Sequence, residues 1–469
     1  MKPNIAFGDF SNLAGEHKSF SDSVRHGWED DELLLVKSEE FGNLRDKISA
    51  YTYSLLRTIE FEACWLISCP NSDFKILLGE KIGFDAVCLE ALHNRMFEKL
   101  ASRYLPTVSA AYSKNFTKAV KFQDESDISS FLYSLTQDFC ENIDDYLNQV
   151  DRVTDEPTYL TLKNIKSGLL VQLEKLNKYR RRYLPIETLD SRSQTKCFYS
   201  NSEEIPTVAS FPGRGSQLLF SDTSIVMHKS YTDLMCDREK MQRFSHYVYM
   251  DVEIAAMEVC AKNIVAYREM PLDFKLDMAR QIWDEARHAI IMRRLLENIG
   301  GKEADYTYSA KVWQKCEKGE NVTERLAIQQ VFQEGNALES NFLLTEAFKN
   351  VGEREMTKCM DFINADEAVH VKIGNFWIKY MLDGDPNRYQ TVMEKAASLV
   401  KATLSSNVEV NRAARRISDF QIILWIYLRK IIMFMGIENL DGCSIYTVGC
   451  VAQNKPIINY QYCRVPSPK

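Results

Sequence analysis

The chain has 469 residues, a formal net charge of −7, and a hydrophobic content of 45%. This length predicts more than one domain, and the hydrophobic content is enough to bury cores of ordinary size. With an acidic balance and no block of Lys or Arg, neither nucleic acid nor an anionic membrane is expected as a partner.

Several features indicate a soluble, cytoplasmic protein. The first 20 residues contain no unbroken apolar stretch, so no secretory signal is expected. The most apolar run begins at Ile422 but is interrupted by Arg429 and Lys430, which is typical of a buried helix and not of a membrane span. The 12 cysteines form no CxxC pair, as expected for reduced thiols.

Helical periodicity dominates the chain, with apolar residues at positions i, i+3, i+4 and i+7, and it predicts an all-α fold. Residues 1–44 are expected to form an N-terminal arm. Residues 45–182 contain about four helical stretches and form a scaffold domain without metal ligands. Residues 183–224, rich in Ser, Pro and Gly, read as a linker. Residues 225–436 form a second helical domain, and residues 437–469 a C-terminal extension.

The two helical domains show a weak internal repeat at an offset of 200 residues. DFKI at residues 73–76 matches DFKL at residues 273–276. The same offset aligns Asp85 with Glu285, and a cysteine with the histidine three residues later. If the repeat is real, the first copy has lost its ligands and any metal is confined to the second. Chance similarity is the alternative.

The phrase DEAxH occurs twice, as DEARH at residues 284–288 and as DEAVH at residues 366–370. On a helix, residues three apart lie on the same face, one turn apart. Each phrase can therefore aim a carboxylate oxygen and an imidazole nitrogen at one point, and the pairs are Glu285 with His288 and Glu367 with His370.

A two-metal site in a helix bundle also takes one Glu from each of two further helices. The helical stretch before the first phrase offers Glu253 and Glu258, and the stretch before the second offers Glu334 and Glu339. Neighbours at helical spacing around Glu253 and Glu334 are mainly apolar, so we predict these two as the inward-facing ligands. Glu258 and Glu339 remain open as alternatives.

The positions of the predicted turns support this choice. In an antiparallel pair of helices, ligands at equal height are equidistant from the turn. The midpoint between Glu253 and Glu285 falls at residue 269, within Arg268–Pro271. The midpoint between Glu334 and Glu367 falls beside a glycine at 352. Two nearly equivalent helical hairpins with pseudo-twofold symmetry are therefore expected.

The six candidate ligands comprise four carboxylates and two imidazoles, a donor set that suits Fe(II) or Mn(II). Four negative charges also neutralise two divalent cations, which makes their burial tolerable. Asp284 and Asp366 precede the Glu of each phrase and are expected to accept the free ring N–H of a ligand histidine. Arg287 is expected to brace one of these aspartates. The alternative for all three is a solvated charge on a helix surface.

Within residues 235–400, the segments EIAAMEVCA, DEARH, QEGNALES and DEAVHVKIG resemble the ferritin-like di-iron carboxylate superfamily. The closest resemblance is to an uncharacterised ferritin-like family of bacteria. The resemblance implies a four-helix bundle with a dimetal site, and the same six ligands: Glu253, Glu285, His288, Glu334, Glu367 and His370. The N-terminal half resembles a ligand-free helical domain that sometimes precedes such bundles, a degenerate ferritin-like domain being one reading.

The resemblance implies a non-haem di-iron oxygenase or oxidase that uses O₂ as co-substrate. It would hydroxylate, desaturate, N-oxygenate or halogenate a small or medium organic substrate, free or attached to a carrier protein, for example in secondary metabolism. Manganese can replace iron at one or both positions. No GxGxxG or CxxC motif is present, so a separate electron donor is expected. The oligomeric state, a homodimer included, stays open.

Three alternatives to the oxygenase remain. The first is a ferroxidase or peroxide-handling protein without an organic substrate. The second is a radical-storing subunit, for which Tyr249, one turn before Glu253, is the candidate residue. The third is a scaffold with an inert site. Superfamily members differ in chemistry, so fold alone does not decide between these.

Overall fold

All regular secondary structure that the structure describes is helical, which confirms the all-α prediction for that part of the chain. The computed structural model describes residues 39–100, 114–184, 204–221 and 231–400. An isolated bridge between Phe220 and Tyr308 is the one β-type pairing among these residues. Outside the described residues lie most of the predicted arm 1–44, part of the linker 183–224, residues 401–436 with the run from Ile422, and the extension 437–469.

The N-terminal half consists of long helices around an aromatic core. Phe116 packs edge-on against both Phe61 and Phe131, and Trp65 packs against the same two rings. Acidic caps begin two of the helices, because Asp124 and Asp151 each accept a hydrogen bond from a backbone N–H of the first turn. The helices are α2 (Glu39–Ser68), α3 (Ser72–Leu100), α4 (Lys114–Ala119), α5 (Glu125–Gln149) and α6 (Arg152–Tyr183).

The second half is built on two helical hairpins joined by short turns. The first runs from η5 (Val248–Glu253) and α9 (Ile254–Ala266) into α10 (Leu272–Asn298), and the second from η7 (Ala327–Gln333) and α13 (Glu334–Asn350) into α14 (Arg354–Met381). The chain turns at both expected midpoints, and at the second Gly352 adopts a φ of 80°. Shorter elements surround the hairpins: α7 (Tyr231–Met235), α8 (Arg238–Tyr247), η6 (Glu303–Asp305), α11 (Lys311–Cys316), α12 (Val322–Leu326) and α15 (Pro386–Val400).

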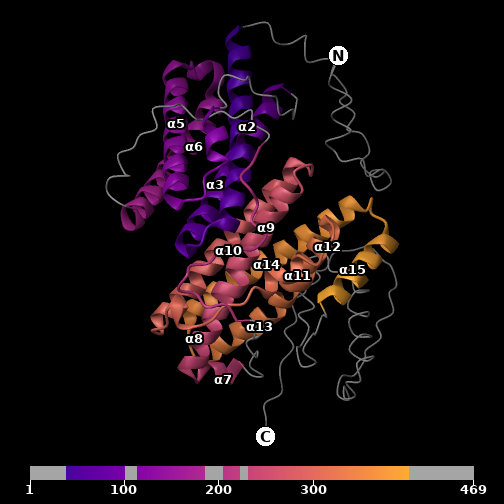
Figure 1. Ribbon diagram of the computed structural model, residues 1–469. Coiled ribbons are helices and arrows are strands. Elements are labelled where there is room, and N and C mark those ends of the chain that lie inside the picture. Colours follow the sequence, from indigo (N-terminus) through magenta and orange to yellow (C-terminus); the bar gives the residue numbers. More distant parts are fainter. Residues whose placement is uncertain (1–38, 101–113, 185–203, 222–230, 401–469) are drawn as a thin grey trace.

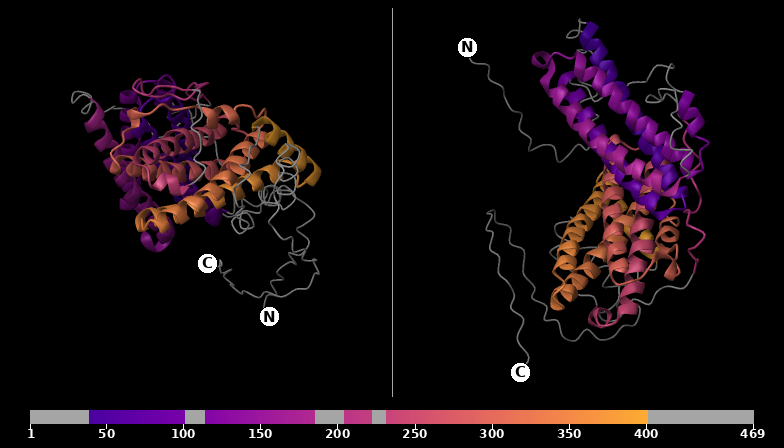
Figure 2. Two further views of the ribbon diagram at one scale, coloured as in Figure 1. Left: turned by 90° about the horizontal axis from the view of Figure 1, so that it is seen from below. Right: turned by 90° about the vertical axis from the view of Figure 1, so that its left-hand side faces the viewer.

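The N-terminal half stands against the first of these hairpins (Figure 1; Figure 2, right). Helix α3 packs along α10, and α2 packs along α9. Two glycines allow the close crossing of α3 and α10. A Cβ atom on Gly83 would lie 2.4 Å from Cβ of Trp283, and one on Gly79 would lie 3.1 Å from Cβ of Ala286. Helices α3 and α10 also begin 200 residues apart, in the register of the predicted repeat. In the described part of the chain, no helix is both long enough and apolar enough to cross a membrane.

We predict that Gly83→Ala lowers the free energy of unfolding by about 1–3 kcal/mol, because the new methyl group overlaps Trp283 and forces α3 away from α10. Urea denaturation followed by circular dichroism measures the change. Val87→Ala, one turn further along α3 at a half-exposed position, is the control and should leave the midpoint nearly unchanged. Equal midpoints for Gly83→Ala and wild type would contradict the close crossing.

Candidate metal centre

The six predicted ligand residues come together in the interior of the second half. Glu253 ends η5, and Glu334 begins α13 directly after η7. The two ExxH pairs project from the middle of α10 and of α14. Each of the six residues is at most 5% exposed: Glu253, Glu285, His288, Glu334, Glu367 and His370. Four helical segments thus converge on one buried cluster.

The donor atoms form two overlapping sets, and within each set they lie within 4.8 Å of one another. The first set is Glu253, Glu285, His288 and Glu367, and the second is Glu285, Glu334, Glu367 and His370. Glu285 and Glu367 belong to both sets, so each has the position of a carboxylate that bridges two ions. Each set also contains one histidine and one further glutamate, and it can hold a metal ion.

Both histidines direct Nδ1 toward the shared carboxylates. His288 Nδ1 lies 3.1 Å from Glu285 Oε2 and 3.6 Å from Glu367 Oε1. His370 Nδ1 lies 3.3 Å from Glu285 Oε1 and 3.4 Å from Glu367 Oε2. Among the described residues, His370 Nδ1 and Glu367 Oε2 have no hydrogen-bond partner although both are buried. Buried polar atoms without partners are costly, and a cation between these donors would satisfy them, so the residues fit a metal centre.

The opposite ring nitrogens answer why the phrase begins with Asp. His288 Nε2 lies 3.2 Å from Asp366 Oδ2, and His370 Nε2 lies 3.3 Å from Asp284 Oδ2. Each phrase therefore supplies the acceptor for the histidine of the other phrase. Arg287 donates through Nη2 to Asp284 and, at 2.8 Å, to Asp366, so it braces both aspartates. Such contacts fix the orientation of ligand histidines and increase their basicity.

Two π-helical segments position the single glutamates, and the sequence pattern did not reveal them. Segment η5 ends at Glu253, and segment η7 ends immediately before Glu334. Each wide turn inserts a residue into an otherwise α-helical run and so rotates the side chains that follow. Turns of this kind are rare and occur frequently at functional sites. Their equivalent placement in both hairpins strengthens the pseudo-twofold relation of the two donor sets.

The metal-free cluster retains protons. Burial, followed by repulsion from Glu285, raises the pKa of Glu253 well above its ordinary value. Burial and the neighbouring Glu334 have the same effect on the pKa of Glu367. Although burial alone would lower it, hydrogen bonds to Asp366 and Glu285 raise the pKa of His288 well above its ordinary value. Metal ions must displace these protons to bind.

The alternative ligands lie outside both donor sets. Glu258 is fully buried, but Arg214 donates to both of its oxygens and Lys75 Nζ lies 2.7 Å from Oε1. Its charge is therefore already neutralised by two cations. Glu339 is also buried on α13 and belongs to neither set. The geometry favours Glu253 and Glu334.

In the N-terminal half, a lysine lies where a repeat would place ligands. Lys81 Nζ lies 2.6 Å from Asp85 Oδ2 and 3.0 Å from Glu62 Oε1, and all three residues are buried. Asp85 corresponds to Glu285 at the offset of 200, and the ammonium group neutralises its carboxylate. Within the described ranges, neither metal-holding group includes a residue of this half.

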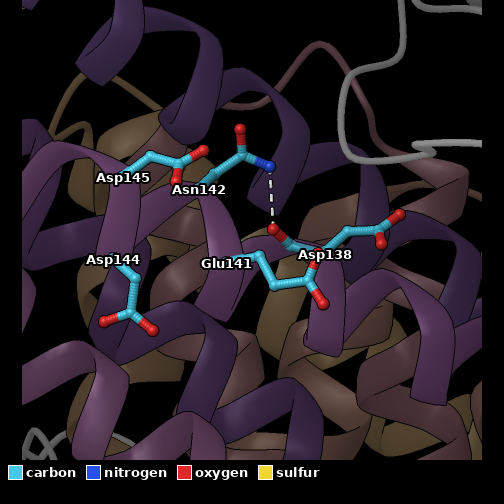
Figure 3. A pocket seen from close by; sticks show the side chains of 5 residues that line it. All are labelled: Asp138, Glu141, Asn142, Asp144 and Asp145. Carbon is cyan, nitrogen blue, oxygen red and sulfur yellow. Dashed lines mark hydrogen bonds between the residues drawn. The ribbon is translucent and has the colours of Figure 1, made fainter.

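An acidic hollow of about 210 Å³ on α5 differs from the buried cluster (Figure 3). Its carboxylates lie on a solvated helix face and do not converge on one point. Asp144 pairs with Lys166, and Asn142 Nδ2 donates to the carbonyl oxygen of Asp138 at 2.7 Å. With no histidine among its lining residues, the hollow reads as a charged helix surface.

Fold and cluster together define an all-helical protein with a buried carboxylate and histidine centre that can hold metal ions. Residues 175–422, just over half of the chain, match the family described as "Protein of unknown function (DUF455)", and the chain belongs to this family. The matched residues contain all six candidate ligands and the aspartates and arginine that support them. Neither the comparison with curated proteins nor the comparison with solved structures finds a match.

We predict that the melting temperature of the metal-free protein falls as pH rises from 6.5 to 9. Although burial opposes it, interaction with Asp284 and Glu285 raises the pKa of His370 from 6.5 to about 9. The folded protein therefore keeps a proton that the unfolded chain releases, so this stabilisation is complete below pH 6.5 and is lost through about pH 9. Calorimetry across this range measures it. Asp284→Asn should flatten the dependence and the exposed control Asp273→Asn should not; equal slopes for the two variants would contradict the assignment.

Proposed function

We propose that the protein is a non-haem di-iron oxygenase or oxidase that uses O₂ to oxidise a small or medium organic substrate. The observation that carries the proposal is the pair of donor sets that share Glu285 and Glu367. Two ions held by common carboxylates are close enough to act together on one small molecule.

The arrangement of the helices supports a ferritin-like bundle as the fold of the second half. The ligands come from four helical segments arranged as two hairpins, with one Glu on the first helix of each hairpin and an ExxH pair on the second. This is the distribution expected of a dimetal bundle. Separations of 32 residues from Glu253 to Glu285 and 33 from Glu334 to Glu367 make the hairpins nearly equivalent.

The donor chemistry favours iron, with manganese as the alternative at either position. Both sets contain carboxylates and imidazoles, and neither contains a thiolate, which is the pattern preferred by Fe(II) and Mn(II) over structural zinc. When bound, two Fe(II) ions supply the electrons that reduce O₂. The glutamates hold the pair and balance its charge, and Asp284 and Asp366 hold the histidines in place. Fully buried side chains on the ligand helices, such as Met257 and Ile282, keep bulk water away.

An open cleft supports access from outside to the groups around the cluster. It has a volume of about 370 Å³, lies between α3 and α10, and is lined in part by Trp283, Asp284 and Arg287. Because Asp284 contacts His370, an electron donor that docks here would come within two side chains of the proposed metal pair. The N-terminal half forms one wall of this cleft, a surface that a simple iron-storage bundle does not need.

Anaerobic loading with Fe(II), metal analysis, and stopped-flow absorbance on mixing with O₂ test the proposal. We expect two irons per chain and a transient visible band in the wild type. His370→Ala should lose the band and retain at most about one iron, because the second set loses its imidazole. His93→Ala, which removes another buried histidine on α3, is the matched control and should behave as wild type.

Two results would change the conclusion. No stoichiometric metal, or no response to O₂ with metal bound, would contradict the oxygenase. Continuous turnover of Fe(II) with no organic substrate would instead favour the ferroxidase alternative. For the radical-storing alternative, Tyr249 is buried and donates to Glu303 Oε2 at 2.9 Å, so a tyrosyl signal after reaction with O₂ that is lost in Tyr249→Phe would favour it.

A further inference from the structure

The terminal glutamates of the two donor sets have different surroundings. Glu334 Oε1 accepts hydrogen bonds from two side-chain amides, Gln281 Nε2 at 3.0 Å and Gln329 Nε2 at 2.7 Å. Gln281 Nε2 also lies 3.2 Å from Oε1 of the bridging Glu285. The amides thus hold one oxygen of Glu334 and leave Oε2 for a metal ion.

The amides are themselves fixed in place. Cys316 Sγ donates to Gln329 Oε1 at 3.3 Å, and Gln330 Nε2 donates to Gln281 Oε1 at 3.2 Å. All four of these residues are at most 1% exposed. Neither amide can turn away without breaking a buried hydrogen bond, so Glu334 is held in one orientation before any metal arrives.

The pseudo-twofold relation shows that the other donor set lacks this support. Gln329 lies five residues before Glu334, and the residue five before Glu253 is Val248. Both positions belong to the π-helical segments, so they are structurally equivalent. Valine has no side-chain donor. Among the described residues, no side-chain amide donates to Glu253, whose nearest imidazole atom, His288 Nδ1, is 3.9 Å away.

The second amide is missing in the same way. Gln281 lies four residues before Glu285, and the residue four before Glu367 is Ile363, which is 1% exposed. An aliphatic side chain therefore occupies the position that would brace Glu253. The asymmetry is built into both hairpins and does not arise from one side chain alone.

We propose that the two metal positions are unequal, with the position of Glu334 and His370 filling first and binding more tightly. A ligand that is already oriented and hydrogen-bonded loses less freedom on binding than one that must be ordered. The position of Glu253 and His288 is then the weaker one, where metal exchanges and the glutamate can change its mode of binding. Gln281 and Gln329 are positioning residues for the first site. The inference rests on the proposed metal pair.

Anaerobic titration of the metal-free full-length protein with Co(II), followed by its visible absorbance, tests the inequality. We expect two phases, with dissociation constants that differ by about 10-fold or more. Gln281→Leu and Gln329→Leu should each weaken the first phase by about 10- to 100-fold, so that the two phases merge. Gln172→Leu, which removes a buried glutamine on α6, is the matched control and should keep both phases.

Single-site variants assign the phases. His288→Ala should keep the tight phase, and His370→Ala should keep the weak one. Ile363→Gln, which adds an amide at the equivalent position, should tighten the weak phase, and it tests the idea even if the leucine variants fold poorly.

Two equal phases in the wild type, or tight binding that survives both leucine variants, would overturn the inference. If equal binding accompanies a normal reaction with O₂, the inference fails while the proposed function stands. If no Co(II) binds at all, both fail.

Discussion

Burial of four carboxylates around one point is the constraint on which the structure of this chain depends. Isolated charges in a protein interior are costly, and without compensation such groups repel one another and take up protons. In the N-terminal half, Lys81 neutralises two buried carboxylates from within the chain. In the second half, no Lys or Arg side chain ion-pairs with any of the four glutamates of the cluster within the described residues, and only two imidazoles lie among them. This difference between two packed hairpins is what points to metal ions as the missing charge.

The supporting structure serves the orientation of the donors. The crossed contacts of Asp284 and Asp366 tie α10 to α14, so the histidines of the two hairpins hold each other in place, and Arg287 joins both pairs at the surface. The π-helical segments set the rotation of the single glutamates. The packing of α3 against α10 closes the outer side of the first hairpin and leaves the cleft above Asp284.

Much of this could be predicted from the sequence, because the relevant rules are local. Helical periodicity gave the fold class, and spacing within the two phrases with the turn midpoints singled out the residues that the structure gathers. Which aspartate meets which histidine depends on the rotation and height of two helices, which no spacing within one helix contains. The π-helical segments leave no regular pattern of apolar residues. Gln281 and Gln329 carried one overlooked signal, since each is a polar residue on a buried helix face.

Anomalous diffraction from crystals grown with Fe(II) and measured at the iron absorption edge would test the central claim most directly. The account predicts two anomalous peaks per chain, both between Glu285 and Glu367, with one next to Nδ1 of His288 and the other next to Nδ1 of His370. A chain without iron at this cluster, or with iron only at the acidic face of α5, would contradict it.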